Sequence, residues 1–236
     1  MNSIGTYQET SLHASLKGWY AQSGDLLETQ VGNYTVDILH GDVIIEIQTG
    51  NFAKIKRKLA HLLEDHPIRL VYPIALEKWI IRQESTGLPL TRRHSPKHGR
   101  LEDLYSELVF IPRLVTHPNF SLEVVFTKEE DIRINDGKGS WRRKGWSIAD
   151  HRLVEIVATH HFTCPNDYLK SIPPDLPQPF TTRQLAERLR LRRHISQKMT
   201  YCLREMGAIQ RAGNQGNAPL YQRADVSAPK HSVTIL

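Results

Sequence analysis

Residues 36–48 read Val-Asp-Ile-Leu-His-Gly-Asp-Val-Ile-Ile-Glu-Ile-Gln, and this stretch decides the fold expected for the chain. It predicts two short apolar strands joined by a two-residue loop, Gly41-Asp42. Glycine at the first central position of such a loop indicates a type II′ hairpin turn. The turn sets a register in which Asp37 faces Glu46. Since directly opposed residues share one face of a sheet, the two carboxylates are expected side by side.

Two facing carboxylates destabilise a hairpin unless a positive group neutralises them. Carboxylate oxygens are the ligands that hard divalent cations prefer. Gln48 lies one step beyond Glu46 on the same face, because side chains alternate along a strand. The pattern Asp-x8-Glu-x-Gln therefore predicts a cation site at Asp37 and Glu46.

The segments around this hairpin predict an α/β fold. A strand, an amphipathic helix and a further apolar strand form a β-α-β crossover, which nearly always implies parallel pairing in a mixed sheet. Helices are expected at 8–21, 51–65 and 101–115, strands at 26–31, 68–74 and 122–134, a basic surface loop at 83–100, and a turn at 136–145. Residues 147–162 fit either a helix or a strand.

The whole-chain composition is that of a soluble globular protein, with 39% hydrophobic and 24% charged residues among 236. No apolar run approaches the roughly 20 residues that span a bilayer, and no signal peptide is evident. Cys164 and Cys202 stand far apart, which fits a reducing cytoplasm better than a disulfide framework. We therefore expect a cytoplasmic protein without membrane contact.

The positive charge is concentrated near the C-terminus. Residues 180–223 hold nine Lys or Arg against two Glu, whereas the chain as a whole has a net charge of +6. Five prolines in residues 165–179 predict a stiff linker before this basic unit. A concentrated basic module points to a nucleic-acid partner.

The basic unit has a clear order of elements. Thr181 and Thr182 predict the start of one helix, a second helix is expected from Arg193, and Gly207 predicts its end. A hairpin with a glycine-rich tip at 213–217 follows, and the chain after Arg223 is expected as a tail.

Residues 7–74 resemble the PD-(D/E)XK nuclease superfamily in the order helix, three meandering strands, helix and strand. The matching motif positions are Asp37, Glu46 and Gln48, and Glu9 stands where the family often has a glutamate on the first helix. The resemblance implies a restriction-endonuclease-like mixed central sheet flanked by helices. It also implies one Mg²⁺ or Mn²⁺ held by Asp37, Glu46 and the backbone carbonyl of Ile47.

Gln48 departs from the lysine of the family motif. An amide positions a water molecule but carries no positive charge and is no base at neutral pH. Lys54 and Lys58 on the following helix are the candidates for the missing charge.

Residues 180–223 resemble winged-helix domains, in which the second helix of the helix-turn-helix enters the major groove and the hairpin contacts the DNA backbone. The resemblance implies that the second helix and the hairpin supply the DNA-binding residues, which are Arg192, Arg193, His194, Gln197, Lys198, Tyr201, Arg211 and Asn214.

These observations predict a nuclease-like domain (1–164), a proline-rich linker (165–179), a small C-terminal winged helix-turn-helix domain (180–223) and a tail (224–236). The leading hypothesis is a metal-dependent DNA endonuclease that its winged helix delivers to duplex DNA. A catalytically inactive DNA-binding protein or transcriptional regulator on a nuclease-like scaffold stays open, as does an RNA nuclease. A homodimer is open as well, since many enzymes of the superfamily dimerise to cut both strands.

Overall fold

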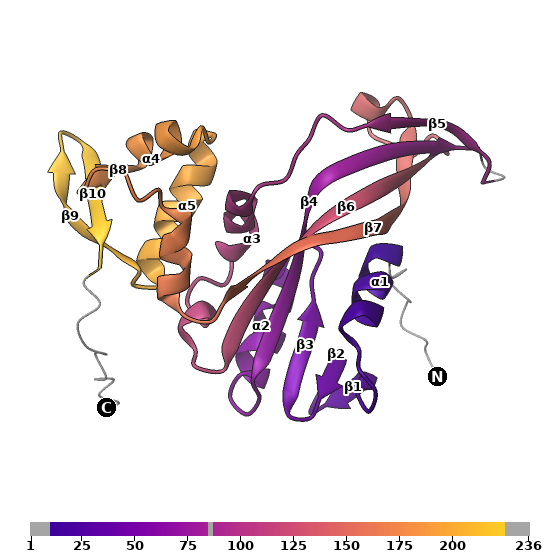
Figure 1. Cartoon of the computed structure of the whole chain (residues 1–236), viewed down its shortest axis with the longest axis horizontal. Coiled ribbons are helices and arrows are strands. Elements are labelled where there is room, and N and C mark those ends of the chain that lie inside the picture. The colour runs from indigo at the N-terminus through magenta and orange to yellow at the C-terminus, as the bar shows by residue number, and fades with distance from the viewer. Residues whose placement is uncertain (1–9, 85–86, 225–236) are drawn as a thin grey trace.

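The computed structural model of the protein describes residues 10–84 and 87–224, which build two β-sheets with helices around them (Figure 1). In chain order the elements are α1 (Ser11–Tyr20), β1 (Leu26–Val31), β2 (Tyr34–His40), β3 (Val43–Ile47), α2 (Phe52–Leu62), β4 (Ile68–Gln83), β5 (Pro89–His94), η1 (Leu101–Leu104), α3 (Tyr105–Leu108), η2 (Leu114–Thr116), β6 (Phe120–Asn135), η3 (Trp141–Arg143), β7 (Trp146–Phe162), η4 (Pro165–Ser171), β8 (Phe180–Thr181), α4 (Thr182–Leu189), α5 (Arg193–Glu205), β9 (Ile209–Gln215) and β10 (Ala218–Arg223), where η marks a 3-10 helix.

The larger sheet has seven strands in the order β1-β2-β3-β4-β6-β7, with β5 also paired to β4. Strands β1, β2 and β3 form an antiparallel meander, β3 is parallel to β4, β4 is parallel to β6, and β7 runs antiparallel to β6. Helix α2 makes the crossover from β3 to β4. The expected α/β class with a mixed sheet is confirmed.

The hairpin β2–β3 has the register that its turn predicts. His40 pairs with Val43 and Ile38 pairs with Ile45 across the loop. Gly41 has a φ of +56°, as a type II′ turn requires at its first central position. The paired ladder ends at Ile38 and Ile45, so the two strands separate just before they reach the acidic side chains.

Helices cover both faces of the sheet next to this hairpin (Figure 1). On one face, Leu12 and Leu16 of α1 pack with Ile45 and Val71. On the other face, residues of α2, including Leu59, pack with their strand neighbours Ile44 and Leu70 in a larger core. Because side chains alternate along each strand, the same strands contribute residues to two separate apolar layers, one on each face of the sheet.

Three sequence-based expectations beyond residue 74 need correction. Strand β4 continues to Gln83, and the expected basic loop contains strand β5, which pairs with its distal half. Arg92 of β5 lies over the ring of Trp79, 4.7 Å from its centroid, so the basic residues are held by the sheet. The region 101–115 forms short helical turns instead of one long helix. Residues 147–162, which fitted either a helix or a strand, belong to strand β7.

The proline-rich segment 165–179 is packed against the rest of the protein. It contains the 3-10 helix η4, and its Tyr168, Ile172 and Leu176 are buried. These side chains belong to the same apolar core as Met199 and Leu203 of α5. Prolines therefore fix a compact connection here instead of an extended spacer.

Within the described part of the chain, every helix is too short or too polar to cross a membrane.

A pair of buried tyrosines provides a test of this packing. The hydroxyl of Tyr105 lies 2.6 Å from Ser171 Oγ, whereas among the described residues the buried hydroxyl of Tyr168 has no hydrogen-bond partner. We expect Tyr105→Phe to lower the free energy of unfolding by about 1 kcal/mol, because it removes a hydrogen bond, and Tyr168→Phe to leave it unchanged or raise it slightly. Urea unfolding of both variants measures the difference. Equal losses in the two variants would contradict the assignment of partners.

Candidate active site

Asp37 and Glu46 lie at the point where β2 and β3 separate. Asp37 Oδ2 accepts a hydrogen bond from the backbone N–H of Ile47 at 2.8 Å. The carboxylate thus satisfies a backbone donor that lies beyond the end of the strand ladder. The side chain of Glu46 is 5% exposed, and that of Asp37 is 20% exposed. Glu9, the fourth expected site residue, lies outside the described residues.

Lys58 of α2 supplies the positive charge beside Glu46. Its Nζ lies 2.5 Å from Glu46 Oε1 and donates to the backbone carbonyl of Thr35 at 2.6 Å. The lysine therefore lies across β2 and β3, with its ammonium among oxygens. The sequence named Lys54 and Lys58 as alternatives, and the structure selects Lys58 as the partner of Glu46.

His13 of α1 is the site residue that the sequence did not indicate. Its Nε2 lies 3.0 Å from the carbonyl oxygen of Ile47 and 3.3 Å from Asp37 Oδ2. Because a carbonyl oxygen only accepts, Nε2 carries the proton and donates it. The sequence held only a weak indication of this role, which is that His13 follows Leu12 of the buried apolar stripe in the expected first helix.

The surroundings shift the pKa values of the two carboxylates in opposite directions. Burial opposes ionisation of Asp37, but the hydrogen bonds from His13 and from the Ile47 N–H outweigh it and lower the pKa of Asp37 below its ordinary 3.8. Burial raises the pKa of Glu46 to about 7, although the charge of Lys58 opposes the shift. Asp37 is therefore the firmly ionised member of the pair.

The oxygen atoms of this site have the chemistry that a hard cation requires. Two carboxylates and the Ile47 carbonyl belong to it, and Mg²⁺ takes one or two carboxylates and keeps several waters. In the described residues, no cluster of three or more His, Cys, Asp or Glu side chains is arranged to bind a metal. The imidazole of His13 contacts Asp37 and the Ile47 carbonyl, and the ammonium of Lys58 contacts Glu46, so each of the three groups already has a partner in the protein.

Gln48 is engaged in the turn that leads into α2. Its side-chain amide donates to the carbonyl of Gly50, and its backbone N–H donates to the carbonyl oxygen of Val71 at 2.9 Å. Asn51 follows with a φ of +60°, a conformation that asparagine tolerates. The structure thus gives Gln48 a local hydrogen-bonding role beside the carboxylates.

Most of the expected DNA-binding residues are exposed, and one points inward. The exposed residues lie on α5, at its start or in the β9–β10 hairpin, and they are Arg192, Arg193, His194, Gln197, Tyr201, Arg211 and Asn214. The guanidinium of Arg211 donates to the side-chain oxygen of Asn214 at 2.7 Å. Lys198 was expected on this outer face, but its Nζ points to the carbonyl of Ser106 at 3.4 Å, because that side of α5 packs against α3.

An open groove of about 1030 Å³ runs along the exposed side of α5. It includes Arg193, Gln197 and Tyr201, which the sequence indicated. Three further arginines that line it were not among the expected contacts, namely Arg183, Arg190 and Arg204, and the acidic Glu187, which pairs with Arg183, lines it as well. These arginines come from α4, its end and α5, so only the packing of the two helices brings them together.

The chain belongs to a protein family described as "Domain of unknown function (DUF8091)", which matches residues 10–163. A relative from Treponema pallidum (strain Nichols), named "Uncharacterized protein", is 30% identical over 185 residues, covering 78% of this chain and 74% of the relative. No solved structure matches the chain.

The ion pair between Lys58 and Glu46 leads to a stability prediction. Lys58→Met leaves a buried carboxylate without its cation, and we expect it to lower the free energy of unfolding by about 2 kcal/mol. In the Lys58→Met/Glu46→Gln double variant, most of this loss should disappear, because the carboxylate of Glu46 is removed together with its cation. Chemical denaturation measures both. Lys56→Met on the exposed side of the same helix is the matched control, with an expected change within about 0.5 kcal/mol.

Proposed function

We propose that this protein is a divalent-metal-dependent DNA endonuclease that hydrolyses phosphodiester bonds, with a restriction-endonuclease-like domain and a winged-helix domain that binds duplex DNA. The observation that carries the proposal is the pair of carboxylates where β2 and β3 separate, with Asp37 bonded to the Ile47 N–H and Glu46 paired with Lys58. A helix, an antiparallel meander, a crossover helix and a parallel strand surround these residues, which supports the resemblance to the PD-(D/E)XK superfamily.

Asp37, Glu46 and the Ile47 carbonyl would hold Mg²⁺ or Mn²⁺. When bound, the ion polarises the scissile phosphate and lowers the pKa of an attacking water. His13 and the Ile47 N–H keep Asp37 ionised and oriented through their hydrogen bonds. Lys58 offsets the negative charge that gathers when a phosphate approaches two carboxylates, which is the task of the motif lysine that Gln48 replaces.

The C-terminal elements support the winged-helix assignment. Strand β8 pairs with β10, and β10 pairs with β9, so the small sheet has the order β8-β10-β9. With η4 before β8, and α4 and α5 after it, the chain order becomes helix, strand, helix, helix and hairpin. The arginine-lined groove along α5 gives a surface for phosphates and base edges.

Cleavage of a DNA panel in Mg²⁺ or Mn²⁺ tests the catalytic proposal. We expect metal-dependent cleavage that EDTA abolishes. Asp37→Asn and Glu46→Gln should reduce the rate at least a hundredfold, because each removes a charged oxygen ligand, and Lys58→Gln should reduce it less. Lys56→Gln is the matched control. Full activity of the Asp37 and Glu46 variants would show that the assigned site is wrong.

A second candidate function is a catalytically inactive DNA-binding protein or transcriptional regulator. His13 and Lys58 favour it, since they already give both carboxylates a partner in the protein. It predicts DNA binding in EDTA and no cleavage with any divalent ion or any DNA. An RNA nuclease would differ by cutting RNA in preference to DNA. Measurements of molecular mass with and without DNA address the homodimer.

Binding to duplex DNA is expected to be salt-dependent through the groove on α5. Replacing Arg193 and Arg204 together with alanine should weaken binding at least tenfold and reduce the slope of log K against log salt by about 1 to 2, because up to two phosphate contacts are lost. Fluorescence anisotropy in EDTA measures both quantities. Lys138→Ala, an exposed lysine in the turn after β6, serves as the control. Unchanged affinity of the double variant would place DNA binding elsewhere.

The two free cysteines, Cys164 and Cys202, also support our proposal that the protein works in a reducing cytoplasm.

A further inference from the structure

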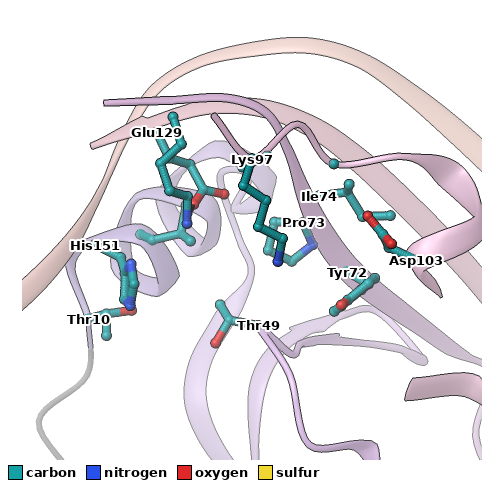
Figure 2. A pocket seen from close by; sticks show the side chains of 13 residues that line it. Thr10, Thr49, Tyr72, Pro73, Ile74, Lys97, Asp103, Glu129 and His151 are labelled. Atoms are coloured by element: carbon teal, nitrogen blue, oxygen red, sulfur yellow. Dashed lines mark ion pairs between the residues drawn. The ribbon is translucent and has the colours of Figure 1, made fainter. Parts of the chain in front are cut away.

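A cavity of about 220 Å³ opens beside the candidate active site (Figure 2). It exists because β3 ends at Ile47 whereas its neighbour β4 continues to Gln83. The edge of β4 beyond Val71 therefore lacks its strand partner until β5 begins to pair at Trp79. Thr49, the residue after Gln48, lines the cavity.

The loop 95–99 closes the other side of this cavity. The backbone N–H of Ser95 donates to Lys78 O at 2.7 Å, and that of Gly99 donates to Ala75 O at 2.8 Å. A β-carbon at Gly99 would lie 2.5 Å from Ala75 O, so only glycine allows this close approach. The loop is thus fixed along the free edge of β4 and holds Lys97 at the cavity.

Several charged side chains at or beside the cavity are paired with one another. Lys78 Nζ lies 2.9 Å from Glu129 Oε2 and 3.2 Å from Asp131 Oδ1, and Asp131 also accepts from His151 Nδ1 at 2.8 Å. Asp103 accepts the backbone N–H of Arg100 at 3.0 Å.

Lys97 is different, since it has no ion pair within residues 10–84 and 87–224. Figure 2 shows its side chain directed into the cavity, between Thr49 and Tyr72. Lys97 is exposed, and its ammonium, together with the hydroxyl groups of Thr49 and Tyr72, offers hydrogen-bond donors and positive charge to an anion such as a phosphate, whereas Asp103 and Glu129 on the same lining carry negative charge.

The size and the apolar side of the cavity restrict the ligand further. A cavity of about 150 Å³ holds benzene, and drug-sized ligands need about 300 Å³ or more. The cavity lies between these limits, which suits one nucleobase with its sugar phosphate at the opening. Leu12, Pro73 and Ile74 provide an apolar wall for a base.

We propose that this cavity accepts one unpaired nucleotide of the substrate strand, next to the phosphate that is cut, with its own phosphate on Lys97 and Thr49. The inference rests on the proposed nuclease function and names its substrate class: DNA that has an unpaired nucleotide adjacent to the scissile bond. Taking a paired base out of the stack costs a few kcal/mol, so an unpaired or mismatched nucleotide enters more readily.

Binding of a deoxynucleoside 5′-monophosphate to the full chain tests this inference without catalysis. In EDTA, NMR or calorimetric titration should show the monophosphate binding at least tenfold more tightly than either inorganic phosphate or the deoxynucleoside. Lys97→Gln should weaken that binding about tenfold, whereas the exposed control Lys138→Gln should not change it. Equal binding of inorganic phosphate and the monophosphate would overturn the proposal, as would an unchanged affinity in Lys97→Gln.

Two comparisons keep this inference separate from the proposed function. Asp37→Asn removes a candidate metal ligand but lies outside the cavity lining, so monophosphate binding in that variant reports the cavity alone. In cleavage assays, the wild type should prefer a duplex with one unpaired nucleotide over a fully paired duplex, and Lys97→Gln should lose this preference. Cleavage without any such preference would overturn the cavity proposal and leave the nuclease proposal standing.

Discussion

The burial of Glu46 is the constraint on which the candidate site depends. A carboxylate that is almost completely enclosed between a sheet and a helix is costly unless a cation accompanies it. Lys58 meets this need from α2, and it contacts the Thr35 carbonyl as well, so the helix is tied to both strands of the hairpin. The same contact thus links the position of α2 over the sheet to the chemistry of the site. A change in either would disturb the other.

The part of the fold that could be predicted from sequence is the part governed by local rules. Gly41 set the turn and hence the pairing of Ile38 with Ile45, and the apolar stripe of α2 set its buried face. The length of β4 was not predictable in this way, because its distal half is stabilised by β5 and β6, which lie further along the chain. The basic residues of β5 have the composition of a loop, and only the ladder with β4 makes them a strand.

In the candidate site, too, local rules predicted some residues and distant contacts decided others. Asp37 and Glu46 were indicated by the register, and they do lie together where β2 and β3 separate. His13 was missed because its contact with the Ile47 carbonyl joins residues 34 positions apart, one before the meander in sequence and one at its end. Lys198 was expected on the outer face of α5 from helical spacing alone, but the docking of α5 on α3 turns it inward. Spacing predicts which residues share a face, whereas tertiary packing decides what that face meets.

The parallel pairing of β4 with β6 has a consequence for how the molecule assembles. The hairpin and α2 join residues that are close in sequence, whereas Ile68 of β4 pairs with Phe120 of β6 across a long stretch of chain that includes β5 and α3. Contacts of high sequence separation form slowly, because loop-closure entropy opposes them until the strands meet. We expect the carboxylate hairpin to form early, and the distal strands that enclose the cavity to come together in a later and slower phase. The two parts of the site thus differ in folding order, although they are neighbours in the native protein.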